Sequence, residues 1–476
     1  MAGDRDSAAR DGEAVAVLDI GKTNLKILVA TPDGEPLEAV TRAHDFALAE
    51  PYPAIDIDGI VGWLLDTLAD LAPRHRIGAI VTTAHGCGAV LADEGGPVLP
   101  MMDYEAPSPP GIDAAYAAEA PPYSEVFCAT GPGAMQLGKQ LLWQETLYPE
   151  RFARARHHLT TAQYVAWRLG GRAASEVSQV AAQGHLWDPR AGAFSTLVRH
   201  RGWERLYPPF ARAGEPLGTV SAAVADRTGL PRHVEVLCGV HDSNANLYRY
   251  RAAGLADRTI LSTGTWMIGF ERTCPLDRLD GARAMVSNVD VDGAPVASTL
   301  TMTGREYALL AGRAEADDGA VAAALGELLA RGTLALPSFV AQDGLFPGSA
   351  RRGRVVGPAP ASPAESRALA ALYAALTASA CLDLLGSRTP IVVDGGFATN
   401  RLFGRLLAAL RPGQPVAMSR SRDGTALGAA LTWRRFDRRE PVATVALDPV
   451  EPLAPPGLAE AAARWARLAD AAPAPA

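Results

Sequence analysis

The sequence has few cysteines, and none of them are arranged as a pair. The five cysteines are scattered along 476 residues without a C-x-x-C motif. An odd number of dispersed cysteines is typical of reduced thiols in a cytoplasmic protein, and it argues against a disulfide scaffold or a zinc site. The five are Cys87, Cys128, Cys238, Cys274 and Cys381.

Excess positive charge is also absent. The chain has 45 Lys and Arg residues against 52 Asp and Glu residues, which gives a net charge of −7. A surface that neutralises nucleic-acid phosphates needs clustered Lys and Arg, so the composition argues against a nucleic-acid partner. A small phosphorylated ligand is still compatible with this charge, because it needs only a local group of donors.

Long apolar segments are not evident in the sequence. We expect no run of the roughly 20 apolar residues needed to cross a bilayer, and hence no membrane partner. The N-terminus, "MAGDRDSAARDGE", is polar and has no apolar signal-peptide core. These features predict a soluble cytoplasmic protein, with the first 12 residues and the Ala-Pro tail 472–476 disordered. A homodimer is left open.

The length favours two domains. A chain of 476 residues, 48% of them hydrophobic, is too long for one core and has enough apolar mass for two buried sheets. We place the first domain at 13–250 and the second at 251–450, each a mixed α/β sheet flanked by helices. A C-terminal segment, 451–476, follows.

The segment "AVLDIGKTNLKILV", residues 16–29, contains the last three letters of a P-loop. A P-loop also needs a glycine five residues before its Gly-Lys pair and a helix after it. Here that position is Ala16, and β-branched, strand-like residues lie on both sides of the turn. The pattern therefore predicts a hairpin with a tight turn at Gly21.

The tip of such a hairpin can still bind phosphate. Gly21 allows close approach of the backbone, and Lys22, Thr23 and Asn24 supply amide and side-chain donors. Asp19 would repel phosphate unless a cation lies between them, which makes Mg²⁺ the natural companion. An ordinary hairpin with a turn glycine is the alternative on local sequence.

A second segment, "TILSTGTWMIGF" at 259–270, repeats this layout. Aligning the two copies places Gly264 on Gly21, Thr265 opposite Lys22, and Ser262 at the position of the aspartate. Two similar hairpins predict a duplicated fold in which two domains around a cleft hold one polyphosphate–metal complex between the hairpin tips.

With these hairpins the chain resembles the FGGY family of carbohydrate kinases, which has the actin/hexokinase/Hsp70-like (RNase H-like) fold. The resemblance covers nearly the whole chain and rests on five motifs in the family's order, although Lys22 replaces the family's usual threonine. It implies a kinase that uses ATP and Mg²⁺. The motifs are "DIGKTNLK", "GKQLLWQETLYPERF", "LCGVHDSNAN", "STGTW" and "VVDGGFATNRLF".

The resemblance implies a catalytic role for Asp242. Local sequence alone favours a helix N-cap at this strand-to-helix junction. The matching family position is the general base that accepts the proton of the sugar hydroxyl. His241 is predicted to orient the sugar or Asp242, and a packed structural histidine is the alternative.

The resemblance also implies a nucleotide site in the second domain. Gly395 and Gly396 remove side chains where adenine or the α-phosphate would press on the backbone, and the next helix is capped near Thr399 or Asn400. A generic strand-to-helix turn would look similar. The helix at 423–431 is expected to pack against this site. The predicted nucleotide contacts of the second domain are Thr263, Gly264, Thr265, Gly304, Gly395, Gly396 and Asn400.

Fewer residues support the prediction of a sugar-binding site. His85 matches the family stretch that meets the sugar, and Asp103 and Glu105 both fit the position of an aspartate that binds sugar hydroxyls. Carboxylates suit vicinal hydroxyls because each oxygen accepts hydrogen bonds. A tight turn at His85 and solvated acids in the loop are the alternatives.

The predicted reaction is transfer of the γ-phosphoryl group of ATP to a hydroxyl of a sugar substrate. The chain resembles most the 6-deoxyketohexose kinases, which act on L-rhamnulose or L-fuculose, and xylulose, ribulose and erythritol remain open. A nucleotide-driven binding module on the same fold, without catalysis, is the alternative from another class.

Overall fold

The structure is a computed structural model that describes residues 13–421, 423–436 and 443–471. The predicted disordered segments, 1–12 and 472–476, lie outside the described residues. The chain divides into two compact units, and each contains segments that are distant in sequence. Unit 1 consists of Met1–Ala256, Asn288–Pro295 and Asp423–Thr444. Unit 2 consists of Asp257–Ser287, Val296–Arg422 and Val445–Ala476.

The sheet of unit 1 has the strand order β13-β14-β6-β1-β2-β3, and β15 also pairs with β6. Strand β1 is antiparallel to β2 and parallel to β6, so the predicted hairpin is present and leads into a crossover. The strands are β1 (Ala14–Ile20), β2 (Asn24–Ala30), β3 (Pro36–Ala43), β6 (Ile77–Ala84), β13 (Pro216–Thr219), β14 (Glu235–Leu237) and β15 (Val240–His241).

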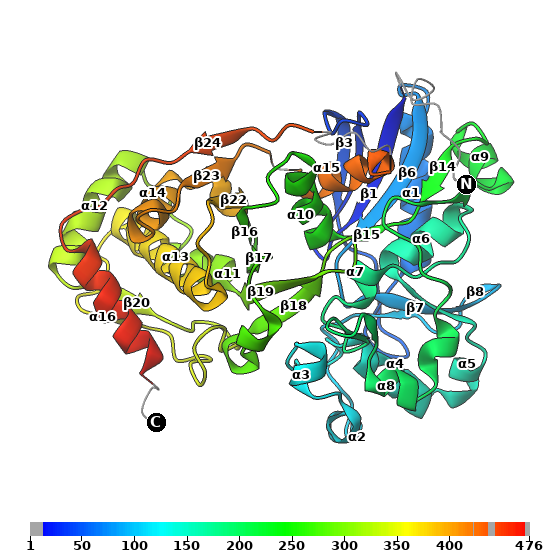
Figure 1. Ribbon diagram of the computed structural model, residues 1–476, viewed down its shortest axis with the longest axis horizontal. Helices are drawn as coiled ribbons and strands as arrows, with labels where there is room; N and C mark the ends of the chain where they lie inside the picture. The colour runs from blue at the N-terminus through cyan, green and yellow to red at the C-terminus, as the bar shows by residue number, and fades with distance from the viewer. Residues whose placement is uncertain (1–12, 422, 437–442, 472–476) are drawn as a thin grey trace. The chain divides into compact units, whose positions relative to one another are not determined.

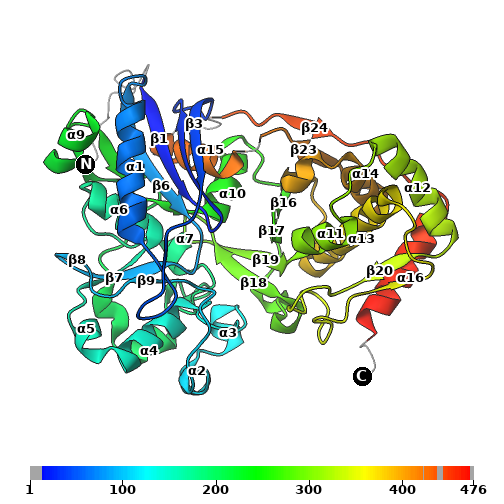
Figure 2. The ribbon, with the colours of Figure 1, turned by 180° about the vertical axis from the view of Figure 1, so that it is seen from behind.

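Helices cover both faces of this sheet, which is why β1 is apolar at almost every position. The alternating side chains of Ala16 and Leu18 pack in a core with α1 (Ile57–Leu71), and Val15 and Val17 pack in another with α10 and α15. Figure 2 shows α1 in front of β1, with α10 and α15 on the far side of the sheet.

Helices α10 (Asp242–Ala252) and α15 (Gly424–Leu431) form the closest helix pair of unit 1 (Figure 1). Their backbones meet at Gly428, where a Cβ atom would lie 1.9 Å from the carbonyl oxygen of Ala245. The expectation that 423–431 packs against the nucleotide motif was therefore wrong. Its small residues serve the packing against α10.

The rest of unit 1 consists of short elements around the end of β6. The strands are β4 (Ala47–Leu48), β5 (Ala54–Ile55), β7 (Ala89–Asp93), β8 (Gly96–Pro97), β9 (Met101–Met102), β10 (His157–Thr160), β11 (Trp187–Asp188) and β12 (Ala193–Phe194). The helices are α2 (Ile112–Glu119), α3 (Tyr123–Val126), α4 (Leu137–Leu147), α5 (Pro149–Ala153), α6 (Thr161–Leu169), α7 (Val177–Val180), α8 (Thr196–His200) and α9 (Ala222–Thr228).

Unit 2 repeats the central topology of unit 1. Its sheet has the order β18-β19-β17-β16-β22-β23-β24, and β16 is antiparallel to β17 and parallel to β22, as β1 is to β2 and β6. The predicted duplicated α/β fold is thus confirmed. The strands are β16 (Thr259–Thr263), β17 (Met267–Glu271), β18 (Met285–Val289), β19 (Pro295–Thr301), β22 (Ile391–Gly395), β23 (Val416–Ser419) and β24 (Leu447–Pro449).

Helix α13 (Pro363–Leu385) is the centre of the unit 2 core. Ser362 is its N-cap and accepts a hydrogen bond from the Glu365 amide at 3.2 Å, as the capping motif predicts. The other elements are α11 (Thr303–Ala311), α12 (Asp318–Ala330), α14 (Arg401–Leu410), α16 (Leu458–Asp470), β20 (Leu334–Leu336) and β21 (Arg354–Val356).

Helix α13 also corrects an expectation. With 23 residues and a mean hydropathy of 1.8 in its most apolar window, it is long and apolar enough to cross a membrane, so the absence of such a run was wrongly expected. In the structure 78% of that window is buried, and the helix packs among strands and helices of unit 2. Its apolar length is used to fill a protein core.

Candidate active site

The first predicted phosphate hairpin lies between β1 and β2. The register pairs Ile20 with Leu25, and the Gly21 amide donates to the Asn24 carbonyl at 3.0 Å. A Cβ atom at Gly21 would lie 2.9 Å from that same oxygen, so the tight turn requires glycine. Thr23 and Asn24 are exposed at the tip. The hairpin offers backbone and side-chain donors, and no helix follows it as a P-loop would need.

Lys22 lies on this hairpin, but its ammonium group contacts the sugar loop, residues 103–105, which the sequence predicts to bind the sugar. It forms an ion pair with Asp103, lies 3.6 Å from the Glu105 carboxylate, and stands 4.7 Å above the ring of Tyr104. The structure thus brings together three residues that the sequence assigned to two different ligands. The predicted contact of Lys22 with phosphate stays a prediction beside this ion pair with Asp103.

Asp19 lies in a cluster of charged residues within unit 1. Burial raises the pKa of Asp19 to about 7, with further increases from the charges of Asp242 and Asp423 and an opposing effect from Lys26. Lys26 is the cross-strand partner of Asp19 and donates to Asp423 at 2.6 Å. Carboxylates that lie close together raise the pKa of a buried member such as Asp19, and a cation between them would relieve their repulsion.

This donor set fits a weakly caged magnesium ion. Among residues 13–421, 423–436 and 443–471, no group of three or more His, Cys, Asp or Glu side chains is arranged to hold a metal. Mg²⁺ is usually bound by one or two carboxylates, several waters and substrate phosphates. Asp19 would supply the carboxylate of such a site.

Asp242 begins α10 and is its first helical residue. The N-cap position belongs to His241, so the capping role that local sequence favours for Asp242 was wrong. The carboxylate accepts hydrogen bonds from the amide and hydroxyl of Ser243, and its side chain is 32% exposed. The positive end of a helix favours a negative charge, and the partial exposure leaves this carboxylate accessible to a ligand.

Two buried histidines lie beside this carboxylate. Burial lowers the pKa of both His85 and His241, which keeps their imidazoles neutral. The His241 Nε2 atom lies 3.4 Å from the Asp242 carboxylate. His85 and His241 come from different strands of the sheet, yet a Cβ atom at Gly86 would lie 3.0 Å from the His241 ring. The structure thus groups the predicted sugar residue with the predicted base.

The His85 ring has one unused hydrogen-bonding atom. Its Nδ1 lies 2.7 Å from the Gly86 carbonyl, so this nitrogen carries the proton and Nε2 is an acceptor. Nε2 is buried and has no hydrogen-bond partner in the described part of the chain. An unsatisfied acceptor is costly in a folded protein unless a ligand or water completes it. This supports the predicted role of His85 as a ligand contact.

Sequence reasoning missed the element that supports both histidines. In α7 the Gln179 amide donates to the carbonyls of Ala84 (3.0 Å) and Val240 (3.2 Å), and the Ser178 hydroxyl accepts from the His241 amide at 3.2 Å. Helix α7 therefore fixes the strand ends that precede His85 and Asp242. No motif marks this four-residue helix, and its partners lie far away in sequence.

The second hairpin, in unit 2, is enclosed by glycines. A Cβ atom at Gly304 would lie 1.8 Å from the Gly264 carbonyl oxygen, and one at Gly395 would lie 2.0 Å from the Thr263 oxygen. Gly395 also has a φ of 82°, in the left-handed region. The Thr263 hydroxyl accepts from the Phe397 amide at 2.9 Å. The predicted second hairpin and the double-glycine turn are therefore in direct contact.

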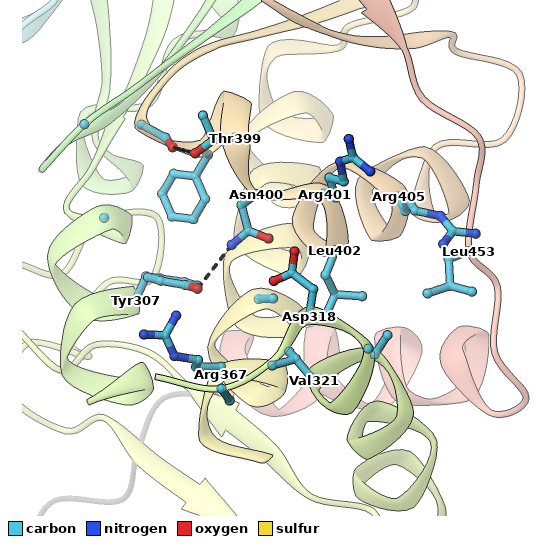
Figure 3. Close-up of a pocket in the computed structure, with 18 residues that line it drawn as sticks. Tyr307, Asp318, Val321, Arg367, Thr399, Asn400, Arg401, Leu402, Arg405 and Leu453 are labelled. Atoms are coloured by element: carbon cyan, nitrogen blue, oxygen red, sulfur yellow. Dashed lines mark hydrogen bonds between the residues drawn. The ribbon is translucent and has the colours of Figure 1, made fainter. Parts of the chain in front are cut away.

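A cavity of about 710 Å³ lies next to this contact within unit 2 (Figure 3). Four predicted nucleotide residues line it, namely Gly264, Gly304, Gly396 and Asn400. The other three predicted residues support the wall of the cavity without lining it, and they are Thr263, Thr265 and Gly395. Asn400 caps α14 by accepting from the Phe403 amide at 3.0 Å, and its amide nitrogen donates to the Tyr307 hydroxyl at 3.2 Å.

The remaining lining residues were not predicted. Figure 3 shows Tyr307 and Arg367 on one side of the cavity and Arg405 and Leu453 on the other, with Asp318 between them. Tyr307 follows Gly304 by three positions on α11, a helical spacing that could have indicated a shared face. A cavity with apolar walls, arginines and a helix N-terminus suits a nucleotide.

Comparison with known proteins gives a consistent result. The model of the FGGY family of carbohydrate kinases, N-terminal domain, matches residues 14–248, and that of the C-terminal domain matches 255–441. The structure is similar to a carbohydrate kinase from Novosphingobium aromaticivorans, with 34% identity and a TM-score of 0.85. This match covers 97% of this chain and 99% of that one.

Other similarities are weaker. A xylulose kinase from Rhodospirillum rubrum shares the fold with a TM-score of 0.75 and 22% identity, over 96% of this chain and 98% of the other. An L-fuculokinase from Escherichia coli is 24% identical over 280 residues, which cover 56% of this chain. The aligned part spans 58% of that L-fuculokinase.

Proposed function

Because this chain belongs to the FGGY family of carbohydrate kinases, we propose that it transfers the γ-phosphoryl group of ATP to a hydroxyl of a ketose. The observation that carries the proposal is the position of the His241 ring, which lies 3.4 Å from the Asp242 carboxylate and next to Gly86, the neighbour of His85. A binding module without catalysis has no need of an accessible carboxylate beside two neutral imidazoles.

Asp242 acts as the base in the proposed reaction. The sugar hydroxyl donates its proton to the Asp242 carboxylate as its oxygen attacks the γ-phosphorus, and the bond from that phosphorus to the β–γ bridging oxygen breaks to release ADP. Phosphoryl transfer depends mostly on positioning and charge stabilisation, so a carboxylate of low basicity suffices when it aligns the hydroxyl. The neutral His241 keeps a hydrogen-bonding ring beside this carboxylate without neutralising its charge.

The hairpins and the unit 2 cavity bind the donor. Gly21 and Gly264 mark the two turns whose other backbone and side-chain donors would bind phosphate, and the cavity next to Asn400 takes the adenosine. Asp19 would hold Mg²⁺, which neutralises phosphate charge when it is bound. We place the activity in the cytoplasm, where the five free cysteines remain reduced.

The acceptor we propose is a 6-deoxyketohexose, with L-fuculose and L-rhamnulose as the first candidates. The similarity to an L-fuculokinase supports this choice. The fold shared with xylulose kinases keeps xylulose as a candidate, and ribulose and erythritol complete the set to be compared.

A ketose panel tests the proposal. The protein is incubated with MgATP and each of L-fuculose, L-rhamnulose, D-xylulose, D-ribulose and erythritol, and ADP release is measured together with the phosphorylated sugar. We expect one ketose to accelerate ADP release strongly with stoichiometric sugar phosphate. ADP release that ignores every sugar would instead support a nucleotide-driven binding module.

A further inference from the structure

Lys22 departs from the family pattern, and its contacts assign it a different ligand. The resemblance places it among the phosphate-binding residues, but its ammonium group contacts Asp103 and Glu105 in the sugar loop, which follows β9. We propose that Lys22 is a positioning residue of the sugar site, which orients Asp103 toward the acceptor. This inference rests on the proposed ketose kinase activity and deepens it.

The hydrogen bonds of Asp103 show how it is held. Its Oδ1 atom accepts from Lys22 Nζ and from the Glu105 amide at 2.9 Å. The second oxygen, Oδ2, accepts no hydrogen bond from any residue in the described ranges. A carboxylate that is fixed through one oxygen presents the other in a defined direction, which suits recognition of a hydroxyl group.

The geometry also separates Asp103 from Glu105. The Asp103 side chain is 27% exposed and directly bonded to Lys22, whereas the Glu105 side chain is 67% exposed and 3.6 Å away. An exposed ion pair contributes little because solvent screens it. The structure therefore favours Asp103 as the sugar ligand and leaves Glu105 as a solvated neighbour that adds negative charge near Lys22.

Lys22 reaches a second sugar residue through Tyr104. The ammonium group lies 4.7 Å above the Tyr104 ring, and this ring packs edge-on against the His85 ring with centroids 5.5 Å apart. A cation over an aromatic face is attracted by its negative charge density. Removal of Lys22 would thus loosen Asp103 and Tyr104 together, and through Tyr104 the ring of His85.

The test compares Lys22→Met, Lys22→Arg and Glu105→Gln with the parent protein. We expect Lys22→Met to raise the ketose KM and the ketose Kd by about 10-fold, because Asp103 loses the partner that holds it. The KM for ATP should stay within about twofold, since the phosphate amides are untouched. Lys22→Arg keeps the charge and should recover most of the sugar affinity. Glu105→Gln, the matched control, should change it less than about twofold.

A double-mutant cycle supplies a readout that a general loss of structure would not produce. Asp103→Asn alone should weaken ketose binding, and adding Lys22→Met to it should cause a clearly smaller loss than Lys22→Met causes alone, because the two changes share the interaction between these side chains and only the contact through Tyr104 is left to lose. Additive losses would overturn the inference. A raised KM for ATP with an unchanged KM for ketose would also overturn it, because that result would indicate that Lys22 binds phosphate.

Ketose binding measured by calorimetry without nucleotide separates the two proposals. A protein that binds a ketose through Lys22 but transfers no phosphate would overturn the kinase proposal and leave this inference standing. Normal phosphorylation with an unaffected sugar Kd in Lys22→Met would overturn this inference alone. Absence of both binding and transfer for every ketose would overturn both.

Discussion

The hairpins of the two units share a topology and differ in where they carry the acid. In unit 1 the carboxylate is Asp19 on β1, opposite Thr83 on β6. In unit 2 the same pair of positions holds Ser262 on β16 and Asp394 on β22. The duplicated fold thus keeps one acid at each hairpin and moves it to the neighbouring parallel strand in the second copy.

The turns differ as well. Four residues separate the last strand pair of the first hairpin, Ile20 and Leu25, and three separate that of the second, Thr263 and Met267. The longer turn projects Lys22 to the sugar loop, and the shorter one is packed under Gly304. The turn of the first hairpin therefore contacts the sugar loop, whereas the turn of the second hairpin forms part of the wall of the nucleotide cavity.

The largest expected effect concerns Asp242, the acid at the start of α10 in unit 1. Asp242→Asn should lower kcat by about 10²-fold or more while leaving ATP affinity nearly intact, because a positioned base is lost. Steady-state kinetics and nucleotide titration measure the two quantities. Asp257→Asn, at an exposed position, is the matched control and should retain full turnover. Full turnover in Asp242→Asn would remove this residue from catalysis.

Because its glycine contacts are closer, the unit 2 hairpin should lose more stability than the unit 1 hairpin when a contacting glycine is replaced by alanine. Gly304→Ala forces a Cβ into the Gly264 carbonyl and should cost about 2 kcal/mol of stability together with ATP affinity. Gly21→Ala meets its nearest atom at 2.9 Å and should cost about half as much. Thermal melting with and without ATP compares them. Equal losses would mean that the two turns are packed alike.

Metal dependence should follow the acid of the first hairpin. Asp19→Ala should raise the Mg²⁺ concentration for half-maximal activity by about 10-fold, because one carboxylate of the proposed site is removed. Ser262→Ala, at the aligned position of unit 2, should shift it less than about twofold. Activity measured across a magnesium series decides this. The same response in both variants would contradict the assignment of the metal to Asp19.

The smallest expected effect is a difference in acid sensitivity. All nine histidines lie in unit 1, and burial lowers the pKa of His158 from 6.5 to about 3. At a pH between 6.5 and about 3, His158 binds a proton in the unfolded chain but not in the folded chain. The contribution of this histidine to stability is therefore fully present above pH 6.5 and is lost as the pH decreases toward 3.

His158→Gln should abolish this part of the loss, which amounts to roughly 1 kcal/mol at pH 5.5. Urea unfolding of the parent and the variant at pH 7.5 and 5.5 measures it, and hydrogen exchange locates it. Equal pH dependence of the two proteins, or acid loosening that is confined to unit 2, would contradict the prediction.

The frame of the fold could be predicted because its signals are local. The alternation of Ala16 and Leu18 with Val15 and Val17 identifies a strand covered on both faces, and the glycine turn after it identifies a hairpin. The repetition of this pattern at 259–270 predicts duplication. These features depend on neighbouring residues, so one sequence is enough to show them.

The contacts that complete the site could not be predicted, because they join distant segments. Gln179 reaches two strand ends that lie 95 and 61 positions away in sequence, and Lys26 reaches Asp423 across 397 positions. No local pattern encodes such pairs. The contact of Lys22 with Asp103 could not be predicted for the same reason, since Asp103 lies 81 positions away in sequence.

The chain returns to unit 1 with α15 long after the rest of that unit has been made. Because α10 packs against α15 through Gly428, the covering of its buried face has to wait until the ribosome has synthesised residues near 431. Unit 1 is therefore begun first during translation and is completed only after most of unit 2 has been synthesised. A fragment that stops at the end of α10 would leave Ala245 and Tyr248, buried in the full chain, without their cover.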